Sequence, residues 1–429
     1  MKSPKRALTG AALASTLVVV TTSCATDGEA SGPDGFEGRG PITYVAGADS
    51  TGLVPLIIDD WNQDHPDEQV TFIELPEQPD AQRQQMIQNA QTQADTFTVL
   101  SVDVVWTAEF AANGWIDELP RDRFDLDAMM EPVVATGEYQ GRLFSVPESS
   151  DGAMLYYRTD LLEAAGIDGP PETWAEMTAV CEAVLALPEA ADMSCYAGQF
   201  EKYEGLTVNF AEAVGSAGGS IVDEGGTVTV DSPEAREGLD FLVGAFDDGL
   251  IPREAVTYQE EQGRQAFQDG ELVFHRQWPY QYALANAEDG SSEVAGLFDV
   301  APLPGLNGPG TSSLGGHNLA VSAFAENRAT ALDFIEYFTS EEKQLRALRE
   351  ASLAPAYAHL YDDPSLVEEY PYLPVLRESI LNGVPRPRVV RYGDTTAAIQ
   401  DEAYAALTGD KTAEQALSDL QARLEGLTS

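Results

Sequence analysis

Positive charge is scarce in this sequence. Over 429 residues, 24 Lys and Arg residues stand against 71 Asp and Glu residues, which gives a formal net charge of −47. Phosphate backbones and anionic lipids are bound by clustered cations, so this composition argues strongly against nucleic acid as a partner and disfavours anionic membrane surfaces. Hydrophobic residues still make up 43% of the chain, which is enough for a sizeable core. The length predicts two or three domains, at roughly 100–200 residues each.

Motifs of common hydrolases and nucleotide-binding proteins are also missing. There is no G-x-S-x-G elbow, no H-E-x-x-H pair and no Walker loop. The four histidines, His65, His275, His317 and His359, are too far apart in sequence to suggest a metal site. We therefore expect no catalytic residues, no cofactor and no metal. A glycosidase needs only two well-placed carboxylates, so an enzyme remains an alternative at this point.

The N-terminus has the pattern of an export signal. Cations among the first six residues precede an apolar run over residues 7–20, which is shorter than the ~20 residues of a membrane span. Cys24 follows a small residue and resembles a lipobox cysteine, although Thr21 stands where Leu is usual. We expect a signal peptide over residues 1–23, lipidation of Cys24 and a flexible tether over residues 24–40. The chain would then be held by lipid on the outer face of the cytoplasmic membrane; simple secretion is the alternative.

Two further cysteines, Cys181 and Cys195, stand close together in the sequence. In an oxidising exterior compartment such a pair predicts a disulfide. Two buried free thiols are the alternative.

Strands and helices alternate in the first part of the chain. The expected strands are Ile42–Ala46, Val70–Leu75 and Phe97–Val102, with helices starting near Leu53 and at Asp80, which we expect to be the cap. This alternation predicts an α/β lobe with a largely parallel sheet. Ligands of such sheets collect beyond the carboxyl ends of the strands, where Asp49 and Asp103 are found.

A second lobe is expected to begin after residues 149–152. Its clearest signals are a strand over Met154–Arg158, a capping box at Thr173–Glu176 and a helix start at Ser232–Pro233. A strand over Asn318–Val321 is expected to return to the first lobe. The C-terminal third is expected to be mainly helical.

Acidic and aromatic residues occur together in two predicted loops, Asp103–Trp106 and Gln277–Tyr282. This combination suits a sugar, because carboxylates accept hydrogen bonds from hydroxyls and an aromatic ring covers the apolar face of the pyranose. For Trp106 or Trp278 considered alone, ordinary packing in the core is the alternative to a role in sugar binding.

Several segments, in order along the chain, resemble the extracellular solute-binding proteins of ABC importers. The resemblance covers nearly the whole chain from Ile42 onward. It is strongest to the sugar-binding branch of this family and, within that branch, to the trehalose-binding lipoproteins of actinobacteria. The segments that carry it are Gly47–Gly52, Met86–Gln91, Asp103–Phe110, Cys195–Leu206, Tyr258–Glu261, Gln277–Tyr280 and Leu314–Gly316.

This resemblance implies an α/β fold of the periplasmic-binding-protein-like type II, with a mixed sheet in each lobe and the ligand cleft between them. Lobe I is expected over residues 41–150 plus 311–355, and lobe II over residues 151–310 plus 356–429. The implied ligand is a disaccharide, trehalose-like or maltose-like. Hinge closure would deliver it to permease subunits, and the protein is expected to be a monomer.

Residue matching implies a set of ligand-binding positions. They are Asp49, Asp103, Asp151, Glu260, Trp278, Leu314, Gly315 and Arg391. The carboxylates would accept from hydroxyls, Trp278 would stack on the sugar, and Leu314 and Gly315 would present backbone. Arg391 would donate hydrogen bonds and close the site. Asp151 stands where relatives tend to carry Asn, and His317 where they often have Trp.

Other roles are open for some of these residues. Asp49 could cap the helix that follows it, and Arg391 could form a surface ion pair. For the whole chain, a secreted glycosidase using Asp103 or Glu260 is one alternative function. The same scaffold binding a polyamine or an oligopeptide is another, although Arg391 in the site would oppose a polycation.

Overall fold

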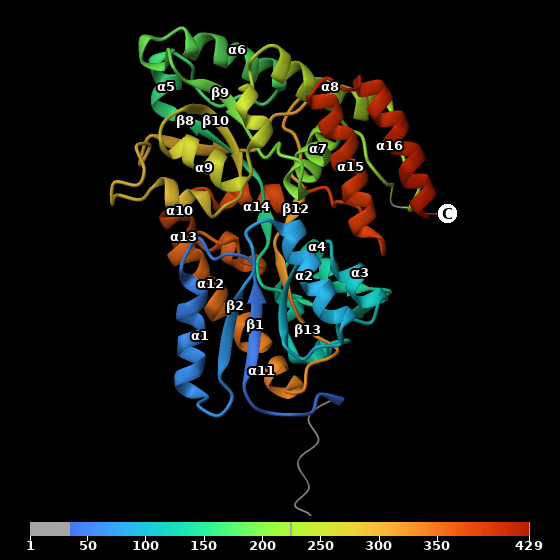
Figure 1. Cartoon of the computed structure of the whole chain (residues 1–429). Coiled ribbons are helices and arrows are strands. Elements are labelled where there is room, and N and C mark those ends of the chain that lie inside the picture. Colours follow the sequence, from blue (N-terminus) through green and yellow to red (C-terminus); the bar gives the residue numbers. More distant parts are fainter. Residues whose placement is uncertain (1–34, 224, 429) are drawn as a thin grey trace, which may run out of the picture.

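Two separate β-sheets divide this computed structural model into two lobes, which lie one above the other in Figure 1. The structure describes residues 35–223 and 225–428. The expected signal peptide, the lipidation site at Cys24 and most of the expected tether lie outside the described residues. Within them, no helix combines the length and the apolar character that a membrane crossing requires.

The first sheet has the strand order β2-β1-β3-β13-β6. Its strands are β1 Ile42–Ala46, β2 Val70–Glu74, β3 Val99–Asp103, β6 Val146–Pro147 and β13 His317–Val321. β1 runs parallel to β2 and β3, whereas β13 is antiparallel to β3 and β6. β3 lies at the centre and is buried along its whole length. The predicted return of the chain to the first lobe through Asn318–Val321 is therefore confirmed.

The second sheet has the strand order β11-β8-β10-β9 and is also mixed. Its strands are β8 Met154–Arg158, β9 Ser194–Ala197, β10 Leu272–Gln277 and β11 Phe298–Ala301. β10 is parallel to β9 and antiparallel to β8, on which β11 also packs antiparallel. All six residues of β10 are buried, which fits a central strand covered on both faces.

The chain passes between the sheets through a short antiparallel pair, β7 Asp151–Gly152 and β12 Leu314–Gly315, and it crosses a third time between α12 and α15. β7 joins β6 of the first sheet to β8 of the second, and β12 joins β11 back to β13. We call β7 and β12 the crossing strands. In Figure 1 they lie at the junction of the two lobes, beside α14.

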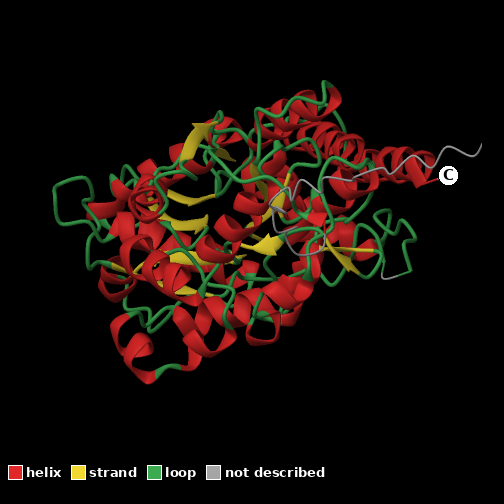
Figure 2. Ribbon diagram, turned by 90° about the horizontal axis from the view of Figure 1, so that it is seen from below, coloured by secondary structure: helices red, strands yellow, loops and turns green. Residues whose placement is uncertain are grey.

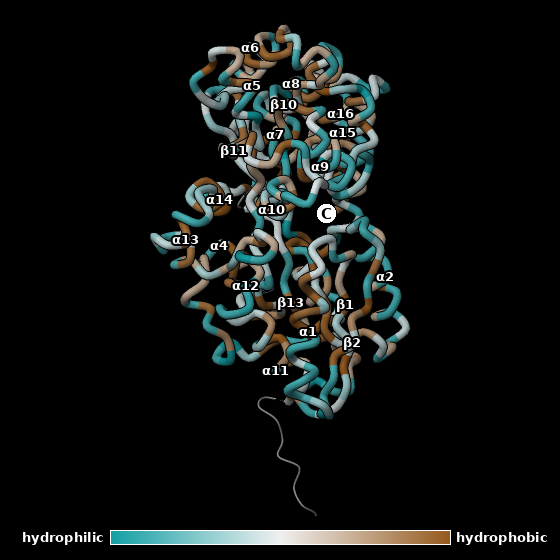
Figure 3. The backbone as a smooth tube through the Cα atoms, turned by 90° about the vertical axis from the view of Figure 1, so that its left-hand side faces the viewer, coloured by the Kyte–Doolittle hydropathy of each residue, from teal (hydrophilic) through white to brown (hydrophobic). Residues whose placement is uncertain are grey.

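Helices cover both sheets, as the view from below in Figure 2 shows. Around the first sheet they are α1 Leu53–Asp64, α2 Pro79–Gln91, α3 Thr107–Ala112, α4 Glu131–Val134, α11 Arg328–Phe338 and α12 Glu341–Ala351. Around the second they are α5 Thr159–Ala164, α6 Trp174–Leu185, α7 Glu204–Ser216, α8 Pro233–Asp247, α9 Glu260–Gln268, α15 Tyr392–Leu407 and α16 Ala413–Thr428. Near the junction lie α10 Gln281–Ala285, α13 Pro364–Glu369 and α14 Leu373–Leu381 (Figure 3). A small hairpin, β4 Glu138–Tyr139 and β5 Arg142–Leu143, completes the strands of the described residues.

The helix signals in the sequence correspond to real caps. Thr173 Oγ1 accepts from Glu176 N at 3.1 Å while the Glu176 carboxylate accepts from Thr173 N at 3.2 Å, so the predicted capping box opens α6. Ser232 Oγ accepts from Ala235 N at 3.1 Å at the start of α8. Asp80 was predicted to cap α2, and this is wrong: the cap is Gln78, and Asp80 lies inside the first turn.

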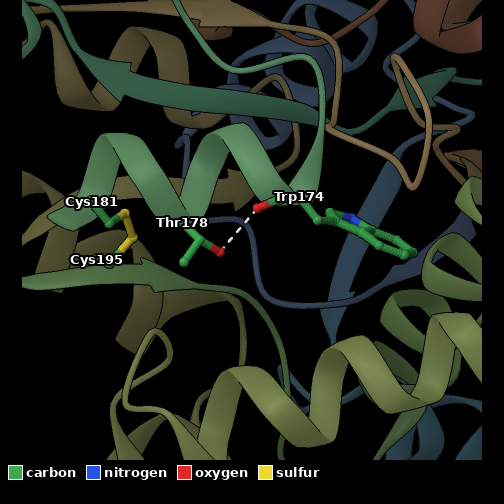
Figure 4. The surroundings of a disulfide bond; sticks show 4 residues. All are labelled: Trp174, Thr178, Cys181 and Cys195. Carbon is green, nitrogen blue, oxygen red and sulfur yellow. Dashed lines mark hydrogen bonds between the residues drawn. A yellow bond between two sulfur atoms is a disulfide. The ribbon is translucent and has the colours of Figure 1, made fainter. Parts of the chain in front are cut away.

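A disulfide joins α6 to β9. Cys181 and Cys195 are bonded, with their Cα atoms 5.6 Å apart, and Figure 4 shows the bond at the end of α6 that lies away from Trp174. Both cysteines are buried, at 2% and 0% exposure. The bond closes a short stretch of chain between a helix and a sheet that it covers.

Replacing both Cys181 and Cys195 by Ala should lower the free energy of unfolding by about 3 kcal/mol, because the reduced unfolded chain regains the freedom of a loop of about 15 residues. Urea denaturation followed by circular dichroism measures this. The wild type unfolded in the presence of a reductant is the control and should lose the same amount. Unchanged urea midpoints in both would contradict a structural role for this bond.

Candidate functional site

A cavity of about 500 Å³ lies between the two lobes and is lined by residues of both. The first lobe contributes the loop after β1, the end of β3 and the loop after β6. The second lobe contributes the first turns of α7 and α9 and the loop after β10. The crossing strands, helices α1, α2 and α12, the end of α11, the loop after α12 and the segment before α15 contribute the rest of the lining. Its volume is in the range of small-molecule sites.

Six of the eight residues expected from the sequence lie in this lining. They are Asp49, Asp103, Asp151, Glu260, Trp278 and Gly315. They come from positions far apart in the sequence and from both sheets. Leu314 and Arg391 are not in the lining.

Asp49 lies in the lining and also holds the start of α1. Its Oδ1 accepts from the backbone N of Thr51 at 2.9 Å and of Gly52 at 3.1 Å, and its Oδ2 accepts from Val54 N at 2.9 Å. The bond from Val54 N satisfies an N–H group in the first turn of α1, and the other two hold the loop before that helix. Gly52 is the cap residue, so Asp49 supports the start of α1 from outside the cap position, and only part of its carboxylate is free to face the cavity.

Asp103, the last residue of β3, forms an ion pair with Arg386. Arg386 Nη2 lies 2.9 Å from Asp103 Oδ1, and its Nη1 lies 2.6 Å from Glu204 Oε1 at the start of α7. The Arg386 side chain is 2% exposed. This guanidinium therefore binds one carboxylate of each lobe at the cavity wall. Sequence reasoning missed both Arg386 and Glu204.

Arg391 does not reach the cavity, so the expectation for it is not met. Its side chain is 55% exposed and forms an ion pair with Asp394 in the first turn of α15, with Nη2 2.6 Å from Oδ2. Both arginines precede α15: Arg391 is its N-cap residue and points to the surface, whereas Arg386, five residues earlier, stays buried. The arginine of the cavity is Arg386.

Leu314 and Gly315 are adjacent on β12 and point to opposite sides, as alternate strand residues do. Leu314 is buried in the hydrophobic core at 5% exposure. A Cβ atom on Gly315 would lie 2.9 Å from Cη2 of Trp278. Glycine is therefore required at position 315 because the indole ring packs against its backbone.

Asp151, on β7, presents its carboxylate to the cavity. Burial raises its pKa from 3.8 to about 6; the positive charge of a protonated His317 opposes this rise, and Asp103 reinforces it. The structure gives the carboxylate no hydrogen-bond donor among the described residues. Asp151 thus keeps its acceptor capacity open toward the cavity.

Glu260 and Glu148 each accept a hydrogen bond from a tyrosine. Tyr203 Oη donates to Glu260 Oε2 at 2.7 Å, and burial raises the pKa of Glu260. Tyr44 Oη donates to Glu148 Oε1 at 2.8 Å, and Ser101 Oγ donates to its Oε2 at 2.7 Å. Glu148 follows β6, so it lies at the end of a strand, as Asp103 does. It was not predicted as a site residue because a strand of two residues has no recognisable sequence pattern.

Trp278 follows β10 and is partly buried. Its backbone N donates to Gln277 Oε1 at 2.9 Å, and Tyr156 Oη donates to its carbonyl at 3.0 Å. The guanidinium carbon of Arg276 lies 3.9 Å from the centre of the indole ring. Trp278 lines the cavity, whereas Arg276, which lies over its ring, does not.

The lining as a whole is acidic. It contains eight carboxylates, Asp49, Glu77, Asp103, Glu148, Asp151, Glu204, Glu260 and Glu261, and two cationic side chains, Lys343 and Arg386. Hydrogen-bond acceptors therefore surround an aromatic face, an arrangement that can bind a polyhydroxylated ligand or a cation. No group of three or more His, Cys, Asp or Glu residues within residues 35–223 and 225–428 is placed to hold a metal ion.

Polar contacts also join the lobes beside the cavity. Asp80 of α2 accepts from Glu204 N, in the first turn of α7, at 3.0 Å and from Gln400 Nε2 of α15 at 3.3 Å. A Cβ atom on Gly393 would lie 2.3 Å from Nη2 of Arg83, so α15 also approaches α2 closely there. These contacts explain why Asp80 is not available to cap its own helix.

Comparison with known proteins gives consistent matches. A family model described as bacterial extracellular solute-binding protein matches residues 47–345. The chain is 32% identical over 362 residues to a "Probable ABC transporter-binding protein" of Deinococcus radiodurans, with 83% of this chain and 86% of that protein covered.

Solved structures match the fold. Maltose-bound MalE3 of T. maritima superimposes with a TM-score of 0.85 at 33% identity, covering 90% of this chain and 99% of that one. The GacH receptor of Streptomyces glaucescens, solved unliganded and with acarbose, superimposes with a TM-score of 0.79 at 21% identity, over 91% and 99% of the two chains. The expected type II fold is confirmed by these superpositions.

Replacing Asp151 by Asn should stabilise the protein above pH 6. The folded protein keeps the Asp151 proton up to about pH 6, whereas the unfolded chain releases it near pH 3.8, so burial of the charged form opposes folding increasingly between these values. The stability gain of Asp151→Asn should be absent below pH 4, grow up to pH 6 and stay constant above it. Urea denaturation at pH 4, 5, 6 and 7.5 measures it. The same exchange at the exposed Asp59 is the control, and a variant less stable than the wild type at pH 7.5 would refute the argument.

Replacing Arg386 by Met should open the two lobes, because Asp103 and Glu204 lose their shared cation and can recover hydration only by separating. Small-angle X-ray scattering should show a larger radius of gyration. The matched control is Arg391→Met, which removes an exposed arginine five positions away and should leave the scattering curve unchanged. Identical curves for the wild type and Arg386→Met would contradict this role of Arg386.

Proposed function

Since this chain belongs to the family of bacterial extracellular solute-binding proteins, we propose that it captures a disaccharide, trehalose-like or maltose-like, between its lobes and delivers it to an ABC importer. Members of this family bind solutes and are not enzymes, and they work with the permease subunits of the importer. The proposal concerns which solute this chain takes.

The observation that carries the proposal is the presence of Trp278 in a lining that also contains several hydrogen-bond acceptors. Asp103, Asp151 and Glu260 line the same cavity as the indole. A pyranose presents an apolar C–H face and a rim of hydroxyl groups, so the ring would cover the one while the carboxylates accept from the other. A buried acceptor left without a donor costs about 1–3 kcal/mol, so these carboxylates would also select the sugar.

The relatives support a sugar. T. maritima MalE3 is described as maltose-bound, and its chain is 33% identical to this one over nearly its whole length. The proposed trehalose-like specificity rests on the resemblance of the sequence segments and of the lining residues.

Delivery would use a hinge motion about the crossing strands. β7 and β12 are only two residues long each, and they join rigid sheets. Bonds such as Asp80 to Glu204 N would form as the lobes close. We propose lobe I as residues 41–150 plus 311–355 and lobe II as residues 151–310 plus 356–429.

Family membership also supports the export signal at the N-terminus. We propose that the signal peptide is removed before Cys24, that Cys24 is acylated and that residues 24–40 tether a monomer to the outer face of the cytoplasmic membrane. The apolar run over residues 7–20 and the small residue before Cys24 support this proposal.

A polyamine is the second candidate, favoured by the acidity of the lining. Most of these carboxylates, however, already have partners in the chain. Asp103 and Glu204 share Arg386, and Glu261 accepts from Tyr280 Oη at 2.8 Å. The charge available to a polycation is therefore much smaller than the number of acids suggests, and a neutral sugar is the better fit.

A thermal-shift screen tests the choice of ligand, because a molecule that binds only the native state raises the melting temperature. We expect trehalose or maltose to raise it, by the equivalent of about 2.7 kcal/mol at a hundred times the dissociation constant, and spermidine to leave it unchanged. A shift with spermidine and none with any disaccharide would overturn the proposal. So would glucose release from either sugar that is abolished in Glu260→Gln, since that would indicate a glycosidase.

Calorimetry on Trp278→Ala then locates the site. We expect at least about tenfold weaker sugar binding by a protein that still folds, because the stacking surface is lost. Trp115→Ala, which removes a partly buried indole outside the lining, is the matched control and should bind normally. Unchanged affinity in Trp278→Ala would remove this residue from the site.

A further inference from the structure

A buried ion pair that does not touch the cavity lies directly behind Trp278. Arg276 Nε lies 2.7 Å from Glu212 Oε2 and Nη2 lies 2.5 Å from Oε1, in a two-point contact between β10 and α7. The side chains are 1% and 6% exposed. Such a pair does not in general stabilise a fold more than packed apolar side chains do, because both charges must be desolvated. Core stability therefore does not explain why this ion pair is present.

The Arg276 guanidinium also contacts the ring of Trp278, on which we propose that the sugar stacks. Its central carbon lies 3.9 Å from the centre of the Trp278 ring, a distance typical of a cation–π contact. The contact orients the ring, because the planar guanidinium is itself fixed by Glu212. Gln199 fixes it further, by accepting from Arg276 Nη1 at 2.8 Å and from Asn209 Nδ2 at 3.1 Å.

Glu212 links this unit to the crossing strands. Its Oε1 accepts from Ser313 N, immediately before β12, at 3.0 Å. The neighbouring Ser312 Oγ accepts from Ala153 N, immediately after β7, at 2.7 Å. One carboxylate thus connects the arginine behind the ring with the backbone at the junction of both crossing strands.

We propose that Arg276 is a positioning residue for ligand binding. It holds the Trp278 ring at a fixed angle against the cavity and, through Glu212, fixes the ring relative to the crossing strands. This inference rests on the proposed function in that Trp278 is taken as the platform for a sugar. The placing of the ring itself does not depend on the ligand.

A double-mutant cycle separates positioning from general structural support. Arg276→Lys keeps the charge but loses the planar two-point contact with Glu212. We expect it to weaken disaccharide binding about five- to tenfold in the wild-type background, and less than about twofold in the Trp278→Ala background, where no ring remains to be positioned. Calorimetry measures all four affinities.

Arg158→Lys is the matched control. Arg158 makes the same kind of two-point contact, with Asp160, at the end of β8 in the same sheet, and it is 8% exposed, but it lies outside the lining. Its replacement should lower the melting temperature and leave the affinity unchanged. If Arg276→Lys does not fold, Glu212→Gln, which keeps the shape of that side chain, takes its place in the cycle with the same expected outcome.

A readout without ligand makes the inference independent of the choice of sugar. Acrylamide quenching of tryptophan fluorescence, with the Trp278→Ala signal subtracted, reports how exposed the Trp278 ring is in the free protein. We expect stronger quenching of this ring in Arg276→Lys and no change in Arg158→Lys. If the wild type binds no disaccharide, the proposed function fails while this measurement still tests the positioning. Unchanged quenching, or an equal loss of affinity with and without Trp278, would overturn the role assigned to Arg276.

Discussion

The contact between the two lobes depends on one guanidinium group, that of Arg386. Arg386 lies between Asp103 at the end of β3 and Glu204 at the start of α7, and all three groups are removed from water. Without a cation the two carboxylates would repel each other in a poorly screened environment, and neither would tolerate burial. The cavity wall, the position of α7 and the bond from Asp80 to the Glu204 backbone all depend on the cation that these two carboxylates share.

Carboxylates elsewhere in the cavity lining also need partners, because burial removes them from water. Acids are abundant over the whole chain, but most of those of the lining have partners in the chain: Asp49 binds backbone N–H groups, Glu148 and Glu260 accept from tyrosines, and Asp103 shares an arginine. Asp151 has no such partner among the described residues, and its burial raises its pKa. Acceptors that are held by the chain itself keep a fixed direction, so the cavity is organised before a ligand enters it.

The sequence predicted the frame well because the frame depends on local patterns. Short-range signals predicted two strands, Ile42–Ala46 and Met154–Arg158, and the capping box at Thr173. Tertiary packing does not override these signals. Residues of the lining could be identified from the sequence where they end a strand or directly follow one, as Asp103 and Trp278 do. The prediction failed where only the path of the chain decides which residue turns inward. Arg386 and Arg391 stand in one short basic stretch, and nothing local distinguishes the arginine that turns inward. The capping role of Asp80 was wrong because its partner lies more than a hundred residues away, and the role of the Leu314 backbone stays a prediction.

The narrowness of the β7–β12 pair has a geometric consequence. If the lobes rotate about this pair, as proposed for capture of the ligand, atoms move in proportion to their distance from it. The outer ends of the lobes, at α6 and at α11, would then travel farthest (Figure 1). Occupancy of a site of about 500 Å³ would thereby change the spacing of two remote surfaces, which is a quantity that another protein can sense without touching the ligand.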